Sequence, residues 1–449
     1  MSTRHLEAFF KPRSITVVGA SEQPKLGGVV LRNLLECGFE GHLTAINRKG
    51  YDTVYGVPCH AEVDRLATAP DLAILCTPPV TIPRLVRELG RRGVPAALIL
   101  MGGLATTLSR SQRPLTESVR AAARPSGIRL LGPNSLGILS PRHRLFASYA
   151  HLNVLPGQVA YVGESAVLGS ALIDWARGRG IGFSHFLTLG DVVDVDMADV
   201  IDYLASDPDT RAILLHIERV RNARRFISSV RAASRGKLVL AIKSGHVPAS
   251  QRPEEPVAPG VPHADAVYDA VLRRAGVLRV HSTDELFDAL ETLTRMRPLR
   301  GERLAIFSNG FGPGAVATDA LVRHGGQLAE LSEATRAALG AEMPSFSRAG
   351  NPADLGVLAA PRHYQRALQL LSKDPGVDAV LVVHAPSRQA AGEAFARAVV
   401  ETVSDTQLNV LTSWMGQASV AAARQTLDTA GIPTYETPDQ AVQAFMHMV

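Results

Sequence analysis

The residue types best suited to chemistry follow the first apolar run, in "SITVVGASEQPKLGG" (14–28). Gly19, Ala20, Ser21, Lys25 and Gly27 form a loop before an expected helix. Glycines let the backbone approach an anion closely, and the N–H groups at a helix start favour phosphate. The pattern G-x-G-x-x-G is absent, so we expect a phosphorylated nucleotide other than a nicotinamide cofactor. An ordinary loop with a surface lysine is the alternative interpretation.

The next two apolar runs end at the same expected sheet edge. Asn47, Arg48 and Lys49 follow "HLTAI", at the place where an NAD-type dehydrogenase would carry an acidic residue for the ribose hydroxyls. A basic strand end suits a ligand with an additional phosphate. The third run is followed by Thr77, Pro78 and Pro79. We expect these residues to form a rigid wall of a ligand-binding crevice at this sheet edge.

Short apolar runs alternate with amphipathic segments along the chain, which is typical of buried parallel strands joined by helices. The alternation restarts at "GQVAYVGES" (157–165) and again at "GERLAIFSNG" (301–310). "LASDPDTRAILLHIE" (204–218) also aligns with "LSKDPGVDAVLVVHA" (371–385), with Asp-Pro at the same place. We therefore expect an α/β chain of three doubly wound units, 1–152, 153–298 and 299–449, in which the last two are a duplicated flavodoxin-like fold.

Composition excludes several classes of protein. The three cysteines have neither metal-ligand spacing nor the number of a disulfide framework, so we expect no metal and a reducing cytoplasm. No apolar run reaches the length that spans a bilayer, and the N-terminus does not resemble a signal peptide. The net charge of +5 comes from scattered arginines without interleaved aromatic residues. That distribution disfavours a nucleic-acid partner.

The final segment, "TPDQAVQAFMHMV", has the N-cap Thr437, a proline at the next position and helical apolar spacing. No glycine or proline follows it. The pattern alone fits equally a C-terminal helix and a chain cut from a longer one.

Several motifs together resemble the NDP-forming acyl-CoA synthetases, which include ADP-forming acetate–CoA ligases and, more distantly, the succinyl-CoA synthetase α subunit. They include "KPRSITVVGAS", "INRKGYDTVYGVP", "LLGPNSLGIL", "KLVLAIKSG" and "DAVYDAVLRRAGVLRV". The resemblance implies an N-terminal CoA-binding Rossmann domain followed by two flavodoxin-like domains. It also implies CoA or acetyl-CoA as the ligand of the glycine loop.

A closer likeness is to the ligase-like N-terminal half of Pat-type bacterial protein lysine acetyltransferases. It is carried by "GPNSLG" with Ser135 where ligases usually have cysteine, by "TRMRPLRGERL" and by the final segment. It implies that ATP-grasp and GNAT acetyltransferase domains follow in the full-length chain, and that an acyl-CoA synthetase is the acetylated target. On this likeness, truncation becomes the favoured explanation of the abrupt helical end.

The same resemblance locates the expected catalytic position. Active ligases carry a motif similar to "SHTGALAGSDAVYDA", whose histidine carries phosphate from an acyl phosphate to ADP. With "DAVYDA" (265–270) in register, Val257 stands at the histidine position, and valine has no atom that attacks phosphorus. His263 is six residues further on, and we interpret it as a solvated loop residue. We therefore expect no catalytic residue in this chain.

Other parts of the ligase site are partly retained. Glu218 stands where ligases use a glutamate to hold the histidine, and a locally paired carboxylate is the favoured interpretation here. "VGESAVLGS" (162–170) resembles a helix-opening phosphate motif, in which Glu164 is an acidic replacement and Ser165 is expected to cap the helix.

Three functions follow from these expectations. The favoured one is an inactive ligase-like module that binds CoA or acetyl-CoA and regulates an appended lysine acetyltransferase. The alternative is an active ADP-forming acyl-CoA ligase of the α-subunit type, which uses His263 or a separate subunit. An NAD(P)-dependent oxidoreductase rests on fold analogy alone.

Overall fold

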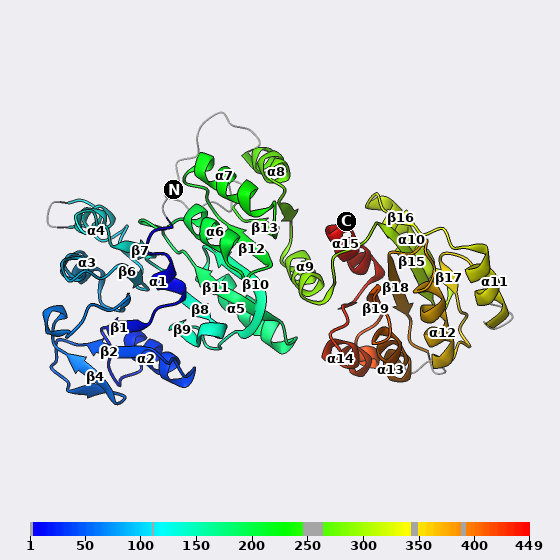
Figure 1. Ribbon diagram of the computed structural model, residues 1–449, viewed down its shortest axis with the longest axis horizontal. Coiled ribbons are helices and arrows are strands. Elements are labelled where there is room, and N and C mark those ends of the chain that lie inside the picture. Colours follow the sequence, from blue (N-terminus) through cyan, green and yellow to red (C-terminus); the bar gives the residue numbers. More distant parts are fainter. Residues whose placement is uncertain (1–2, 110–111, 246–263, 343–348, 388–391) are drawn as a thin grey trace. The chain divides into compact units, whose positions relative to one another are not determined.

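A computed structural model describes residues 3–109, 112–245, 264–342, 349–387 and 392–449. The chain divides into two compact units, Met1–His281 and Ser282–Val449, and each is described by itself. Figure 1 shows two sheets in the first unit and one in the second. The α/β class with mostly parallel sheets, predicted from the alternating apolar runs, is confirmed.

The first sheet has the strand order β3-β4-β2-β1-β5-β6-β7, and all its pairings except β3–β4 are parallel. Its strands are β1 (Ser14–Val18), β2 (His42–Ile46), β3 (Thr53–Val54), β4 (Val57–His60), β5 (Leu72–Leu75), β6 (Ala96–Ile99) and β7 (Arg129–Leu131). The 3-10 turn η1 (Val63–Arg65) follows β4, and η2 (Pro79–Thr81) follows β5. Because the chain builds outward from β1 in both directions, the strand order reverses between β1 and β5, the position where open α/β sheets bind ligands.

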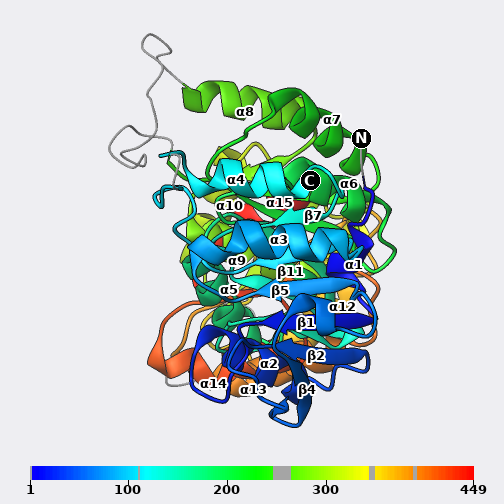
Figure 2. The same ribbon diagram turned by 90° about the vertical axis from the view of Figure 1, so that its left-hand side faces the viewer.

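Helices cover both faces of this sheet. Helices α3 (Ile82–Arg91) and α4 (Leu115–Ala123) pack on one face, in front of the strands in Figure 2. Helix α2 (Leu26–Glu36) packs on the other face. Each helix places its apolar positions on one side, as the 3.6-residue period requires.

The second sheet has the order β14-β13-β12-β10-β11-β8-β9. Its strands are β8 (Gly137–Ser140), β9 (Leu145–Ser148), β10 (Leu155–Gly163), β11 (Gly182–Thr188), β12 (Ala212–Ile217), β13 (Leu238–Lys243) and β14 (Leu278–Val280). The 3-10 turn η3 (Pro141–His143) joins β8 to β9. Strands β10 to β14 pair in parallel, whereas β8 pairs antiparallel to β11 and to β9. The β8–β9 hairpin therefore adds residues 137–148 to the edge of this sheet.

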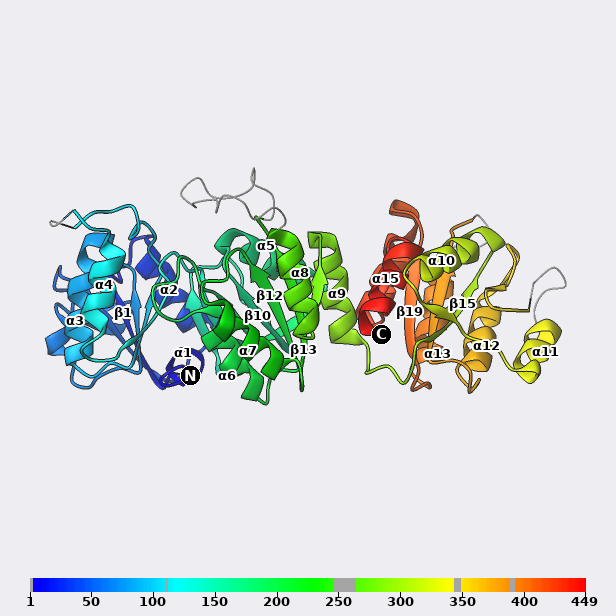
Figure 3. The same cartoon turned by 90° about the horizontal axis from the view of Figure 1, so that it is seen from above.

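Helix α5 (Ala166–Gly178) lies on one face of the second sheet, and α6 (Met197–Ser206) and α7 (Ala223–Ala233) lie on the other, as Figure 3 shows. Helix α8 (Ala264–Arg274) leads into β14. The N-cap predicted at Ser165 is confirmed, because its hydroxyl accepts a hydrogen bond from the backbone N–H of Leu168 at 3.2 Å.

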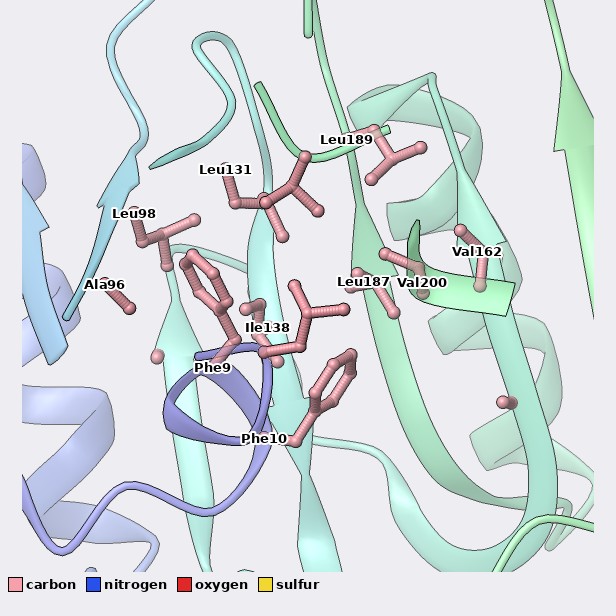
Figure 4. Close-up of a cluster of buried hydrophobic side chains, with 14 of the residues drawn as sticks. Phe9, Phe10, Ala96, Leu98, Leu131, Ile138, Val162, Leu187, Leu189 and Val200 are labelled. Atoms are coloured by element: carbon pink, nitrogen blue, oxygen red, sulfur yellow. The ribbon is translucent and has the colours of Figure 1, made fainter. Parts of the chain in front are cut away.

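A short N-terminal helix, α1 (Glu7–Phe10), joins the two sheets of the first unit through its apolar side chains. Figure 4 shows Phe9 and Phe10 between Leu98 of the first sheet and Leu187 of the second. Both phenylalanines are fully buried, and the Phe10 ring stacks on Tyr203 with centroids 4.4 Å apart. One continuous apolar core therefore serves both sheets.

The described strands of the second unit form the sheet β16-β15-β18-β19-β20, with β17 also pairing with β15. Its strands are β15 (Arg303–Ser308), β16 (Gln327–Leu328), β17 (Ala353–Asp354), β18 (Ala379–His384), β19 (Asn409–Trp414) and β20 (Thr434–Tyr435). Its helices are α9 (Thr283–Arg295), α10 (Phe311–Arg323), α11 (Glu333–Glu342), α12 (Pro361–Leu371), α13 (Gly392–Val403), α14 (Ala421–Thr429) and α15 (Pro438–Met448), with the turn η5 (Ala418–Val420) before α14.

Helix α15 begins as the sequence predicts. The Thr437 hydroxyl accepts from the backbone N–H of Gln440 at 3.2 Å, and Pro438 occupies the first helical position. Within the described ranges, no helix has the length and apolar character needed to cross a membrane.

Replacing Phe10 with alanine tests the shared core. We expect Phe10→Ala to lower the free energy of unfolding of the first unit by about 3–5 kcal/mol, because it leaves a cavity between the sheets. Val167→Ala is the control within the same unit, since Val167 is 82% exposed. Denaturant unfolding of both variants measures the effect, and equal losses would contradict the role of α1.

Candidate functional site

The loop between β1 and α2 depends on two glycines. Gly19 has φ +93°, and a Cβ there would lie 2.9 Å from the Thr77 Cγ2 atom and 3.0 Å from the Cys76 carbonyl oxygen. A Cβ on Gly27 would lie 2.3 Å from the Gly19 carbonyl oxygen. Both positions thus require glycine, and their absent side chains let α2 start directly against the end of β1.

A pocket of about 280 Å³ opens at the carboxyl edge of the first sheet, where the strand order reverses. Five of the residues predicted from the sequence line it together: Gly19, Asn47, Arg48, Thr77 and Pro78. The rest of the wall was not predicted from the sequence: Val18, Ile46, Ala61, Glu62, Val63, Thr81, Arg84, Leu85 and Glu88. Thr81, Arg84, Leu85 and Glu88 lie on or beside α3 at helical spacing. A helix expected directly after β5 was the one sequence signal that could have placed these four side chains at this edge.

Asn47 organises this edge through hydrogen bonds within the protein. Its Nδ2 donates to the Ala20 carbonyl oxygen at 2.6 Å, and its Oδ1 accepts from the backbone N–H of Lys49 at 3.0 Å. These bonds tie the end of β2 to the loop after β1. Asn47 is therefore a positioning residue for the loop.

The remaining predicted residues surround the pocket without being part of its lining. Ala20 and Ser21 are buried, and among the described residues the Ser21 hydroxyl has no hydrogen-bond partner. Lys25 is the exposed N-cap residue of α2, and its side chain makes no cap hydrogen bond. Lys49 is exposed. Outside the lining also lie Gly27, in the first turn of α2, and Pro79, the first residue of η2.

Polar groups of the pocket wall include cations and carboxylates. The exposed Arg48 contributes a guanidinium, whereas Arg84 is paired with Glu88 at 2.7 Å. Thr77 is held by Thr81, whose Oγ1 lies 2.8 Å from the Thr77 Oγ1. Glu62 and Asn47 are also polar, and the rest of the lining is apolar, which suits a ligand with a flat ring system and charged groups at one end.

A second group of ionisable residues lies at the carboxyl edge of the second sheet. The Glu164 carboxylate accepts the backbone N–H groups of Glu218 and Arg219, the latter at 2.9 Å. Burial is the main cause that raises the pKa of Glu164 above its usual value. Val257 and His263, which bear on phosphate transfer, lie outside the described residues. No group of three or more His, Cys, Asp and Glu side chains within the described ranges is arranged to hold a metal ion.

His216, on β12, is a buried histidine at the same edge. Its Nε2 lies 3.0 Å from the Ser244 hydroxyl, and the side chain is 3% exposed. Burial, together with the charge of Lys243, lowers the pKa of His216 from 6.5 to about 4. The folded state therefore favours the neutral imidazole.

This depressed pKa predicts a pH dependence of stability. The stabilisation from a neutral His216 is complete above pH 6.5 and is lost as the pH falls towards about 4, because the unfolded chain takes up the proton first. The shift corresponds to at most about 3 kcal/mol. His216→Gln should flatten the decline in unfolding free energy over this range, whereas His151→Gln, at an exposed histidine, should retain it. Denaturant titrations between the two pH values measure both slopes, and parallel slopes in the two variants would contradict the assignment.

Comparisons with known proteins assign domains to most of the chain. Residues 13–141 match the CoA binding domain, 156–293 the succinyl-CoA ligase like flavodoxin domain and 304–446 the Ligase-CoA domain. The chain thus has a CoA-binding domain followed by flavodoxin-like ligase domains, as the resemblance implies. A dinucleotide forming acetyl-coenzyme A synthetase 1 from Ca. Korarchaeum cryptofilum has the same fold, with a TM-score of 0.92, 29% identity and coverage of 99% of this chain and 96% of that one.

Curated relatives agree with the domain matches. The α subunit of ADP-forming acetate–CoA ligase II from Pyrococcus furiosus is 31% identical over 99% of this chain and 97% of its own length. ADP-forming acetate–CoA ligase I from Archaeoglobus fulgidus is 31% identical over 98% of this chain, which spans 62% of that longer relative. The chain therefore belongs to the family of ADP-forming acetate–CoA ligases, in the part that corresponds to their α subunit.

Proposed function

We propose that this chain is the coenzyme-binding, α-type part of an ADP-forming acyl-CoA ligase. The observation that carries the proposal is the agreement, over nearly the whole chain, with α subunits of acetate–CoA ligases. The pocket at the edge of the first sheet supports it, because that pocket lies within the segment matching a CoA-binding domain. A cytoplasmic location is part of the same proposal.

The pocket has groups that suit CoA or acetyl-CoA. Its apolar walls, such as Val63 and Leu85, would contact the base, and the carboxylates of Glu62 and Glu88 accept hydrogen bonds from amino or hydroxyl groups. Arg48 and the N-terminus of α2 would interact with the phosphates. Lys25 and Lys49, being exposed beside this edge, add positive charge.

Arg48→Ala tests the coenzyme site. We expect about tenfold weaker binding of CoA or more, because a hydrogen bond to a charged group contributes roughly 1.5–3 kcal/mol. Arg91→Ala, at an exposed arginine in the last turn of α3, is the matched control. Calorimetric titration with CoA measures both affinities, and an Arg48 variant that binds like the control would show that the phosphates lie elsewhere.

A ligase of this type needs a group that carries phosphate to ADP. The residue in register with the ligase histidine is Val257, so the proposed ligase would use His263 or a histidine of another subunit. In the direction of acyl-CoA synthesis, the carrier would take a phosphoryl group from ATP, with release of ADP, and pass it to the carboxylate to form an acyl phosphate. The CoA thiol would then attack the acyl carbon, and inorganic phosphate would leave.

One observation favours a second function. Val257, within a segment that also contains Pro256 and Pro259, replaces a nucleophile while the coenzyme loop retains its glycines. A chain that binds acetyl-CoA without transferring phosphate would serve as a regulatory module. Its partners would be ATP-grasp and GNAT domains in a longer chain, and the acetylated target would be an acyl-CoA synthetase.

Phosphate labelling distinguishes the two functions. The chain is incubated with labelled acetyl phosphate, or with CoA and labelled ATP plus an ATP-grasp partner, and acid-labile, base-stable label is counted. The ligase proposal expects label that is lost in His263→Ala or that depends on the partner. Absence of label under both conditions, together with intact CoA binding, would reject the ligase and support the regulatory module.

A further inference from the structure

Ser244 and His216 lie side by side at the carboxyl edge of the second sheet. His216 is on β12, and Ser244 directly follows the last residue of the neighbouring parallel strand β13. The His216 Nε2 lies 3.0 Å from the Ser244 hydroxyl. The pair is fixed through the backbone, because the Ser244 N–H donates to the Ile217 carbonyl oxygen at 3.0 Å. A hydroxyl within hydrogen-bond distance of an imidazole is the arrangement of an activated nucleophile.

The serine is the member of this pair that a substrate can reach. Ser244 is partly exposed, whereas the His216 side chain is 3% exposed. Gly245 has φ +68°, a left-handed conformation that favours glycine, so the chain turns directly after Ser244. Ligands of open α/β sheets bind outside the carboxyl ends of the strands, and the Ser244 hydroxyl lies at such an end.

His216 has the protonation state that a general base requires. Burial, and then the positive charge of Lys243, lowers the pKa of His216 to about 4, so the imidazole is neutral near pH 7. Its Nδ1 has no hydrogen-bond partner among the described residues. In the tautomer with the proton on Nδ1, the Nε2 lone pair accepts the Ser244 hydroxyl proton. Because a low pKa also means weak basicity, the pair predicts slow turnover.

Lys243 places a positive charge beside the serine. Its side chain is buried, with the Nζ atom 5.0 Å from the centroid of the Tyr268 ring. The same ammonium donates a hydrogen bond to the Ser244 carbonyl oxygen. A cation held at this position stabilises negative charge that develops on the carbonyl oxygen of a substrate under attack by the serine.

Exposure distinguishes this pair from other imidazole–hydroxyl pairs of the chain. The Ser140 hydroxyl lies 2.8 Å from the His185 Nδ1, and the Tyr364 hydroxyl lies 2.9 Å from the His384 Nδ1. None of these four residues is more than 1% exposed. Their hydrogen bonds therefore satisfy buried polar groups within the core, whereas Ser244 presents its hydroxyl at a sheet edge.

We propose that Ser244 and His216 form a nucleophilic dyad that accepts an acyl group from an activated ester or thioester and transfers it to water. The Ser244 Oγ attacks the carbonyl carbon while the His216 Nε2 takes the hydroxyl proton. The bond from that carbon to the leaving oxygen or sulfur breaks, and the leaving group takes the proton from His216. Water then attacks the acyl-serine with His216 as base, the carboxylic acid leaves, and the proton returns to the Ser244 oxygen. This activity goes beyond the proposed ligase, because it forms no bond to phosphorus and needs no nucleotide.

Covalent labelling tests the dyad on the unmodified chain. A fluorophosphonate, which reacts with activated serines, is added at neutral pH, and the labelled peptide is identified by mass spectrometry. We expect label on Ser244 in the native chain and none on Ser244 in the urea-denatured chain, because unfolding separates the serine from its base. Native chain without label on Ser244, or equal label in the two states, would overturn the proposal. This readout does not depend on the folding of any variant.

Turnover identifies the acyl donor. The donors are p-nitrophenyl acetate and acetyl-CoA, followed by release of p-nitrophenol and of thiol. We expect Ser244→Ala to abolish turnover and His216→Gln to lower it roughly 10²-fold or more, as for loss of a general base. Ser228→Ala, at an exposed serine of α7, is the matched control and should retain it.

The two donors separate the possible outcomes. Turnover of p-nitrophenyl acetate alone assigns the dyad to oxygen esters, and turnover of acetyl-CoA assigns it to thioesters. Turnover of neither donor, or a Ser244→Ala variant that hydrolyses like the control, would contradict the dyad. Because p-nitrophenyl acetate needs no coenzyme site, its hydrolysis would remain even if the proposed binding of CoA proved wrong.

Discussion

Burial of apolar side chains between the two sheets of the first unit is the constraint on which its architecture depends. Helix α1 supplies Phe9 and Phe10 from the N-terminus, and the hairpin β8–β9 places Ile138 in the same core. Each of these segments would expose apolar surface if the sheets separated. The carboxyl edges of both sheets are therefore built on a single packed core, which is why small differences in their loops can define different sites.

The carboxyl edges of the two sheets in the first unit differ in how their polar groups are satisfied. In the first sheet, the exposed Arg48 lines a pocket of about 280 Å³ together with the carboxylates of Glu62 and Glu88. In the second sheet, the buried Glu164 carboxylate accepts the backbone N–H groups of Glu218 and Arg219. The carboxyl edge of the first sheet is thus open to a pocket, whereas at the edge of the second a buried side chain satisfies two N–H groups of the loop after β12.

Local sequence was sufficient for features that depend on neighbouring residues. The strand ends, the glycine loop and the caps at Ser165 and Thr437 could be predicted, because each involves contacts within a few positions. Arg84 lines the pocket because α3 packs beside it, and this packing depends on tertiary structure. The Glu164 acceptor of the Arg219 N–H lies 55 residues away in the sequence. No local sequence pattern predicts either contact. The pairing of β8 with β11 was likewise decided by tertiary packing.

The β8–β9 hairpin has a consequence for how such chains can be divided and recombined. It follows the coenzyme-binding sheet in the sequence but pairs with β11 of the next sheet. A piece beginning after the hairpin would leave the backbone groups of β11 unpaired along one side, and such an edge invites association with other strands. A gene fusion that exchanges the coenzyme-binding segment must therefore keep this hairpin with the second sheet. The boundary at which the chain can be exchanged thus lies before β8, although the ligand-binding sheet ends at β7.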